Sequence, residues 1–169
     1  PGADKVLTSD ASGNATWAAV AASVDNTPSF RASGGFTNAV SGTWYTMQLS
    51  SESWDTDDAF DTGTYRFTVP VGKGGKYVIS YMVGANMSSA GQRTIGRVDT
   101  NGSDNDASMC SGSPGASSQR VKAVLTMILE LAAGDYIELK GQQNRGIDYS
   151  FRSGETWMTG YKLIGIDDA

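Results

Sequence analysis

The sequence predicts an all-β protein built as an antiparallel sandwich, and three observations support this prediction. Apolar and polar residues alternate with a period of two in several runs, which is the pattern of strands with one buried face. Clusters of Gly, Ser, Asn and Asp separate these runs, as turns separate the strands of a sandwich. The 169 residues suffice for one domain with a short appendage.

The strands are expected where the alternation is regular. In residues 64–71 the odd positions are apolar and the even ones mostly polar, and Pro70 and Gly72 end the run. A Gly74–Gly75 turn precedes the next run, and Gly134–Asp135 suits a tight hairpin turn. The other strands expected on this pattern are 77–83, 136–140 and 157–163, the last with Trp157, Thr159, Tyr161 and Leu163 on one side of the strand.

Residues 120–131 form a run with apolar residues on both sides at its centre. All of its odd positions are apolar, and two of its even positions, Val124 and Ile128, are apolar as well. A strand of this kind is covered on both faces. In a single-domain sandwich the outer face has no intramolecular partner, so a neighbouring subunit is the expected cover.

The first 27 residues differ in texture from the rest and are expected to be a connector to a head formed by residues 28–169. They are small and polar, except for a piece that places Trp17, Val20 and Val24 at positions i, i+3 and i+7. This spacing fits a short helical neck that trimerises beside the head, with Trp17 and Val20 in the interface. A loosely docked linker explains the same residues equally well.

Composition excludes several classes of function. The net charge of −5 and the scattered Lys and Arg residues argue against a nucleic-acid surface. No run approaches the roughly 18 apolar residues that membrane insertion requires. The absence of His excludes a Ser–His–Asp triad and imidazole zinc sites, and the single Cys110 excludes an internal disulfide. We therefore expect a protein that is not an enzyme.

Three segments together resemble the C1q/TNF-like globular head family. Residues 60–70 and 75–79 are similar to its Gly-x-Phe-x-x-Pro and Gly-x-Tyr motifs, 131–139 to its Leu-x-x-Gly-Asp-x-Val-x-Leu hairpin, and 157–164 to its closing aromatic-x-Gly-x-Leu strand. The resemblance covers about residues 28–166. It implies an antiparallel ten-stranded jelly roll that packs as a tight homotrimer, with the first and last strands close together.

The N-terminal segment departs from the animal members of this family, because it has no Gly-x-y collagen stalk. Residues 2–17 instead resemble connecting segments of bacteriophage tail fibres. Together the two resemblances imply an extracellular, receptor-binding fibre tip on the virion that attaches to a host cell-surface glycan or protein. A structural trimerisation cap and a head on a bacterial cell surface or spore coat remain alternatives.

Exposed aromatic rings beside polar side chains are the usual means of binding sugars, since rings provide apolar area and polar groups fix the hydroxyls. Trp54 lies in a polar segment with Asp55 and Asp57, and an ordinary buried ring or solvated loop is the competing interpretation. The segment 142–148 combines amide, guanidinium and carboxylate groups, although a plain hairpin turn has the same composition. The candidate receptor-binding residues are Trp54, Asp55, Asp57, Asn144, Arg145 and Asp148.

Residue type alone suggests two further sites, one for calcium and one for catalysis by carboxylates. Asp99, Asp104 and Asp106 offer the oxygen ligands that calcium prefers, although their segment lacks the Gly and final Glu of an EF-hand loop. No other cofactor is expected. A polysaccharide-degrading enzyme would need two carboxylates, which the acidic stretch could supply. Its candidates are Glu52, Asp55, Asp57, Asp58 and Asp61, and a solvated acidic loop is the simpler interpretation.

Overall fold

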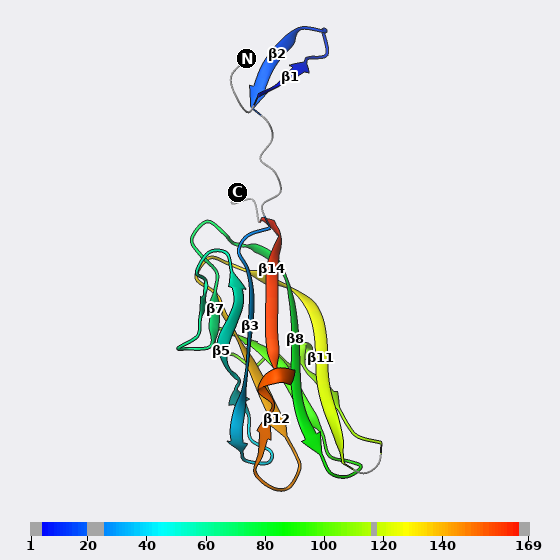
Figure 1. The fold of residues 1–169 in the computed structure, drawn as a ribbon. Helices are drawn as coiled ribbons and strands as arrows, with labels where there is room; N and C mark the ends of the chain where they lie inside the picture. The colour runs from blue at the N-terminus through cyan, green and yellow to red at the C-terminus, as the bar shows by residue number, and fades with distance from the viewer. Residues whose placement is uncertain (1–4, 20–25, 116–117, 166–169) are drawn as a thin grey trace.

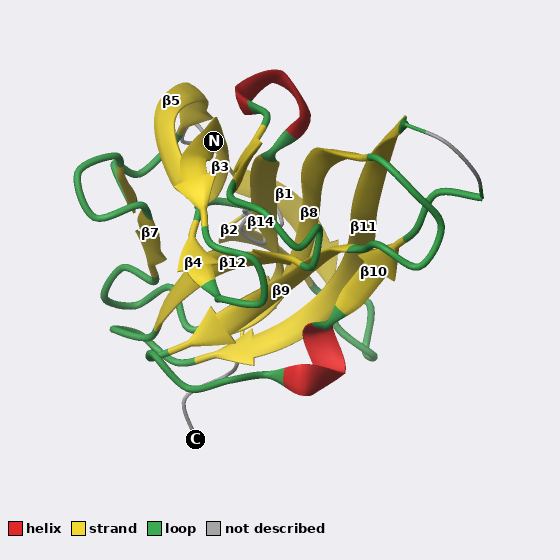
Figure 2. Ribbon diagram, turned by 90° about the horizontal axis from the view of Figure 1, so that it is seen from below, coloured by secondary structure: helices red, strands yellow, loops and turns green. Residues whose placement is uncertain are grey.

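The protein is a two-layered antiparallel sandwich preceded by a separate hairpin (Figure 1). The computed structural model describes residues 5–19, 26–115 and 118–165. One layer, the β8 sheet, has the order β11-β8-β14-β3-β13, with β5 also paired to β3. The other, the β12 sheet, has the order β10-β9-β12-β7-β6, with β4 also paired to β12. Figure 2 shows β8 and β11 in one layer and β9 and β12 in the other.

The strands have the following bounds in the described part of the chain: β1 Lys5–Ser9, β2 Ala15–Ala19, β3 Ser29–Ala39, β4 Tyr45–Thr46, β5 Gln48–Asp55, β6 Phe60–Asp61, β7 Arg66–Thr68, β8 Gly75–Met87, β9 Thr94–Thr100, β10 Cys110–Gly112, β11 Gln119–Leu131, β12 Tyr136–Gln143, β13 Tyr149–Phe151 and β14 Trp157–Gly165. Two short 3-10 turns, η1 (Asp106–Ser108) and η2 (Ser153–Glu155), lie between strands. The expected all-β jelly-roll sandwich is confirmed, and its first and last strands, β3 and β14, are paired.

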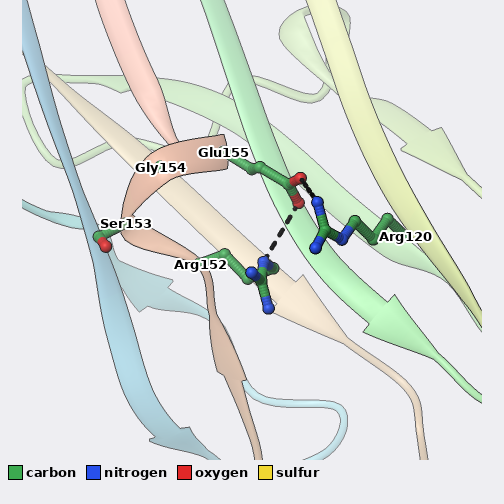
Figure 3. A pocket seen from close by; sticks show the side chains of 5 residues that line it. All are labelled: Arg120, Arg152, Ser153, Gly154 and Glu155. Atoms are coloured by element: carbon green, nitrogen blue, oxygen red, sulfur yellow. Dashed lines mark hydrogen bonds and ion pairs between the residues drawn. The ribbon is translucent and has the colours of Figure 1, made fainter.

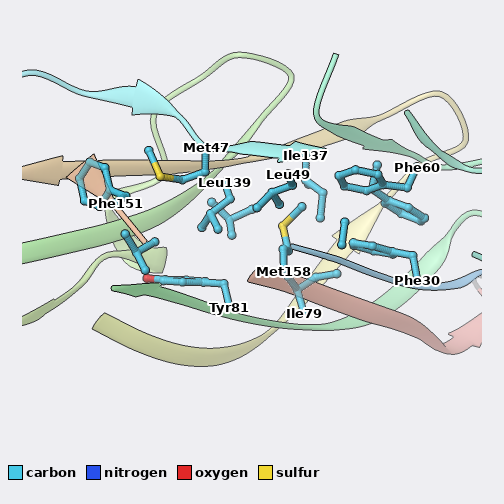
Figure 4. Packing of buried hydrophobic residues seen from close by; sticks show 14 of the residues in the cluster. Phe30, Met47, Leu49, Phe60, Ile79, Tyr81, Ile137, Leu139, Phe151 and Met158 are labelled. Atoms are coloured by element: carbon cyan, nitrogen blue, oxygen red, sulfur yellow. The ribbon is translucent and has the colours of Figure 1, made fainter. Parts of the chain in front are cut away.

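The core lies between the two sheets and is made of residues from nearly every strand (Figure 4). The ring of Phe30 stacks on Phe60 and Phe67, with centroids 5.4 and 4.4 Å apart. The run 77–83 points its odd residues inward as predicted, since Tyr77, Ile79, Tyr81 and Val83 are fully buried. The Tyr81 hydroxyl lies within hydrogen-bonding distance of the carbonyls of Gly96 and Ser108, so this polar group is satisfied inside the core.

The closing strand β14 forms where it was predicted. The side that carries its large aromatic residues faces outward, although their size suggests burial. Met158 and Gly160 face the core, while Trp157, Thr159 and Tyr161 lie on the outer face. A Cβ on Gly160 would come within 2.5 Å of Ile79 Cδ1. The space that a side chain would occupy at this position is therefore filled by the core itself.

The strand expected over 64–71 is shorter in the structure. β7 ends at Thr68, and Val71 is 95% exposed in the turn that follows. Tyr65 has a positive φ of 63° and belongs to the preceding turn, where its N–H donates to Asp61 O at 2.7 Å. Only Phe67 and Val69 of the four alternating residues are buried, because the turns at both ends take the other two out of the sheet.

The helical neck is wrong for residues 15–19, which form strand β2 of a hairpin with β1. Asp10 fixes the turn between them, since its Oδ1 accepts hydrogen bonds from the N–H groups of Ser12 and Asn14, both at 2.9 Å. Hydrogen bonds between the two strands satisfy the backbone N–H and C=O groups that a helix would have paired internally. The positions of Val20 and Val24 lie outside the described residues.

Candidate functional site

The outer face of the β8 sheet carries an apolar surface that the described part of the chain leaves uncovered. On β11, Val124 is 48% and Ile128 59% exposed, while Val121 and Ala123 on the other side are buried. Residues 120–131 therefore lie in a strand with one buried side, and the side that was expected to be covered by a neighbouring subunit is open in the single chain. Exposed apolar surface of this kind is typical of interaction sites.

Strand register extends this surface across three strands. Ile128 lies opposite Val78, which lies opposite Tyr161, and these three form one cross-strand row. Val124, Met82 and Trp157 form a parallel row by the same pairings. A row of hydroxyl groups separates them, in which the Ser80 and Thr126 oxygens are 2.8 Å apart. We call these six residues the apolar face: Val78, Met82, Val124, Ile128, Trp157 and Tyr161.

Trp54 lines a groove beside this face. Its ring is 48% exposed, and a groove of about 420 Å³ runs past it, lined by Asn26, Thr27, Ser29, Trp54, Thr159, Gly160 and Tyr161. Two partly exposed aromatic rings and several hydroxyl or amide groups therefore line one depression. This combination suits the apolar and polar faces of a sugar ring.

The two acidic neighbours of Trp54 are used to hold the chain's own turn. Asp55 Oδ2 accepts a hydrogen bond from the Phe60 N–H at 2.7 Å. Asp57 Oδ2 accepts one from the Thr56 hydroxyl at 2.7 Å, and its Oδ1 lies 3.9 Å from Lys73 Nζ. These carboxylates shape the loop beside the Trp54 groove.

Asn144 and Arg145 also make intramolecular contacts. The Asn144 side chain accepts from the Arg93 N–H, which joins two loops. The Arg145 guanidinium stacks 3.9 Å from the centroid of the Tyr149 ring and donates to Asn86 O at 3.2 Å. Asp148 is exposed. Asn144 is exposed as well, so two of the three predicted residues in this loop are open to solvent and Arg145 is half-buried.

The two predicted clusters lie at opposite ends of the sheet. Trp54 pairs with Arg31 near the start of β3, whereas Tyr149, beside the Asn144–Asp148 loop, pairs with Ala39 at its end. Eight residues of strand separate the two positions, which corresponds to about 26 Å. The six predicted receptor-binding residues therefore do not form one site within one chain.

The three aspartates proposed for calcium surround an arginine. Arg97 Nε lies 2.8 Å from Asp99 Oδ1, its Nη2 contacts Asp104, and its Nη1 lies 3.7 Å from Asp106 Oδ1. The Nε contact is close but is not aligned as a hydrogen bond. In the described part of the chain, no three carboxylate, Cys or His groups are placed to hold a metal ion. The guanidinium supplies the positive charge that calcium was expected to supply.

This arginine belongs to a charged layer on the outer face of the β12 sheet. Glu138 lies directly opposite Asp99 and pairs with Arg66 Nε at 3.1 Å and Lys140 Nζ at 3.2 Å. Asp99 is 2% exposed. Its burial raises the pKa of the carboxyl above the ordinary value of 3.8, and the charge of Arg97 offsets part of that rise. We call Arg66, Arg97, Asp99, Glu138 and Lys140 the charged layer.

The carboxylates of the enzymatic alternative serve mainly as turn acceptors. Asp61 accepts from the Gly63 N–H at 2.7 Å and from the Thr64 hydroxyl at 2.8 Å. The Gly63 hydrogen bond lowers the pKa of Asp61, which is opposite to the change that a general acid needs. Glu52 differs, because partial desolvation and then the charge of Asp55 raise the pKa of its carboxyl.

The hairpin leaves a cross-strand pair of large apolar residues exposed. Trp17, predicted to lie in a trimer interface, is 50% exposed, and Leu7 lies directly opposite it. An isolated two-stranded hairpin is marginally stable in water. Its exposed pair is therefore suited to packing against another chain. No helix in the described residues is long and apolar enough to span a membrane.

One cluster escaped sequence reasoning altogether (Figure 3). A cavity of about 470 Å³ is lined by Arg120, Arg152, Ser153, Gly154 and Glu155. Arg120 is on β11 and the other four residues are in or beside η2, so no local pattern joins them. Only the opposite charges of Arg120 and Glu155, 35 residues apart, gave any hint of a contact.

Comparison with known proteins identifies the fold. No protein-family model matches the sequence, and no curated protein matches it. Among solved structures, the globular domain of zebrafish complement 1qA protein is 16% identical, with a TM-score of 0.56 over 84% of this chain and 100% of that one. Eiger TNF from S. frugiperda is 12% identical, with a TM-score of 0.56 over 85% of this chain and 97% of the other. The chain therefore has the C1q/TNF-like globular fold.

Proposed function

We propose that this chain is a homotrimeric, non-enzymatic binding head at the tip of a bacteriophage tail fibre, where it attaches to a host cell-surface glycan or protein. The observation that carries the proposal is the apolar face, which a single chain leaves open to water. Burying apolar surface stabilises an assembly by roughly 25 cal/mol per Å². A trimer, which the C1q/TNF-like resemblance implies, gives each copy of the face a cover.

The recognition part of the proposal rests on the Trp54 groove and on the connector. The groove sets the exposed Trp54 ring among hydroxyl and amide groups, as a saccharide site does, and Tyr161 at the edge of the apolar face closes its other side. Weak contacts repeated three times in one particle gain avidity, so a modest affinity at each site suffices for attachment. The likeness of residues 2–17 to fibre connectors supports the place at a fibre tip.

A structural trimerisation cap is the second candidate, because the apolar face and the exposed Leu7 and Trp17 pair favour it equally. A cap would trimerise without recognising any surface. A glycan-array screen of the purified trimer separates the two functions. Binding of defined glycans supports the adhesin, and a trimer that binds neither glycans nor host cells supports the cap.

The assembly is tested by Ile128→Asp, with Val71→Asp as the matched control. Both changes introduce a carboxylate at an exposed apolar residue, but Val71 lies outside the apolar face. We expect light scattering to give three chains per particle for the parent and the control, and dissociated or unfolded chains for Ile128→Asp. A monomeric parent at micromolar concentration contradicts the proposal.

A further inference from the structure

The cavity beside η2 is a built feature of the sandwich rather than a gap between loops. The Arg152 N–H donates to Gly84 O at 2.9 Å, and the Gly84 N–H donates to the buried Thr156 hydroxyl at 3.3 Å. A Cβ on Gly84 would come within 2.6 Å of Glu155 Cβ, so only glycine lets the turn lie this close to β8. The fold thus holds Glu155 at a fixed position above the sheet.

Three cations converge on this one carboxylate. Glu155 Oε1 lies 3.4 Å from Arg120 Nη1, and Oε2 lies 3.5 Å from Arg152 Nε (Figure 3). Oε1 also lies 3.9 Å from Lys122 Nζ. The cluster therefore carries an excess of two positive charges in a chain whose net charge is −5. Such an excess attracts anions and is more than Glu155 needs as a partner.

The cluster keeps unused hydrogen-bonding capacity. Each guanidinium has five N–H donors, and both arginines are well exposed, so most of their donors face the cavity or solvent. Glu155 is only 13% exposed, and its Oε2 accepts no hydrogen bond within the chain. Oε2 itself is closed to solvent, so the site offers a ligand the planar donor groups, which suit a carboxylate, and the exposed Ser153 hydroxyl, which suits a sugar hydroxyl.

We propose that this Glu155 pocket, lined by Arg120, Arg152, Ser153, Gly154 and Glu155 with Lys122 beside it, binds an acidic saccharide. Arg120 and Arg152 hold the sugar carboxylate, and the exposed Ser153 hydroxyl, which lines the same cavity, forms a hydrogen bond with a hydroxyl of the same ring. A volume of about 470 Å³ lies within the range of small-ligand sites. The apolar face begins at Val124, one strand repeat beyond Lys122, so the pocket borders that face.

This inference rests on the proposed binding function and names its ligand class. Lys122 pairs with Gly84 near the end of β8, whereas the chain enters the sandwich beside the opposite end, where Gly75 pairs with Gly165. The pocket is therefore directed toward the end away from residues 26–28. Acidic sugars of a host surface would meet this end of a fibre tip first.

The probe is glucuronate, titrated into the parent trimer and followed by calorimetry, with glucose as its neutral counterpart. We expect glucuronate to bind and glucose not to bind. Arg120→Gln and Arg152→Gln should each weaken glucuronate binding at least about 10-fold, because each removes charge-assisted hydrogen bonds. Glu155→Gln should strengthen binding of inorganic phosphate, because it removes the internal competitor for both guanidinium groups.

The matched control is Arg93→Gln, which removes one exposed positive charge at a different loop. It should bind glucuronate like the parent. A trimeric parent that does not bind glucuronate, or an Arg120→Gln variant that binds it equally well, overturns this inference and leaves the trimeric head standing. Inorganic phosphate competing as effectively as glucuronate overturns the saccharide assignment. A monomeric parent that still binds glucuronate overturns the proposed assembly and leaves the pocket standing.

Discussion

Replacing Arg97 by Met tests whether the charged layer depends on this guanidinium. Arg97 and Asp99 are both buried, and the Arg97 guanidinium also lies 4.3 Å from the centroid of the Trp44 ring. Removing one partner of a buried ion pair typically destabilises a protein by about 3–5 kcal/mol, because the other charge stays buried. The charge of Lys140 still reaches Asp99, so we expect the lower end, about 3 kcal/mol at neutral pH.

The loss should depend on pH in a defined direction. The pKa of Asp99 is raised in the folded protein, so its protonated form contributes stability that is complete below the unfolded value of 3.8 and is lost as the pH rises through the folded value. Without Arg97 the folded pKa of Asp99 should rise further. The stability difference between parent and variant should therefore be largest at neutral pH and should shrink as the pH falls toward about 4.

Denaturant unfolding of the parent and the variant at one protein concentration measures this difference at each pH. A second variant, Arg97→Met with Asp99→Leu, removes both charges and should recover much of the lost stability. Asp106→Asn is the control, because Asp106 is exposed and 3.7 Å from Arg97. A loss below about 1 kcal/mol, or one that stays constant from neutral to acidic pH, would refute the reasoning.

Two further changes test the packing. Gly160→Ala should cost about 1–3 kcal/mol, because its methyl group would overlap Ile79, whereas Gly154→Ala, with open space around it, should be nearly neutral. Thermal unfolding of the two variants compares them, and equal melting temperatures would rule out a filled site at Gly160. Arg145→Ala should lower the free energy of unfolding by about 1–2 kcal/mol, because it removes the hydrogen bond to Asn86 O and the stacking on Tyr149. Any loss of host-cell binding should then accompany this loss of stability, because the substitution disturbs the loop. A variant with unchanged melting temperature and reduced binding would instead make Arg145 a direct receptor contact.

The fold was largely predictable because most strands have a regular period of two. Tyr77 to Val83 lie in such a run and are placed correctly. The face of β14 was misjudged because its largest residues, Trp157 and Tyr161, belong to the outer surface and Met158 to the core. Size alone indicates burial only when each sheet has a single apolar face, and the β8 sheet has two.

The candidate site was predictable only where its residues are neighbours in sequence. Trp54 was found because polar residues surround it locally. The Glu155 pocket joins residues 35 positions apart through the register of β11 with β8 and the close approach of η2, and a single sequence carries no signal of either. Trp17 was assigned to a helix because its spacing from Val20 and Val24 fits one turn, although the Asp10 turn signals a hairpin.

The charged layer has a consequence for how far association can proceed. Arg66 and Lys140 already pair with Glu138, and Arg97 with Asp99, so a second molecule would gain little by docking there. The apolar face is therefore the side of the sandwich that suits association, and the charged layer is not. Association confined to one layer of the sandwich favours a closed assembly, whereas a second associating layer would let the assembly extend. An assembly whose size is limited in this way stays dispersed even where many copies of it are close together.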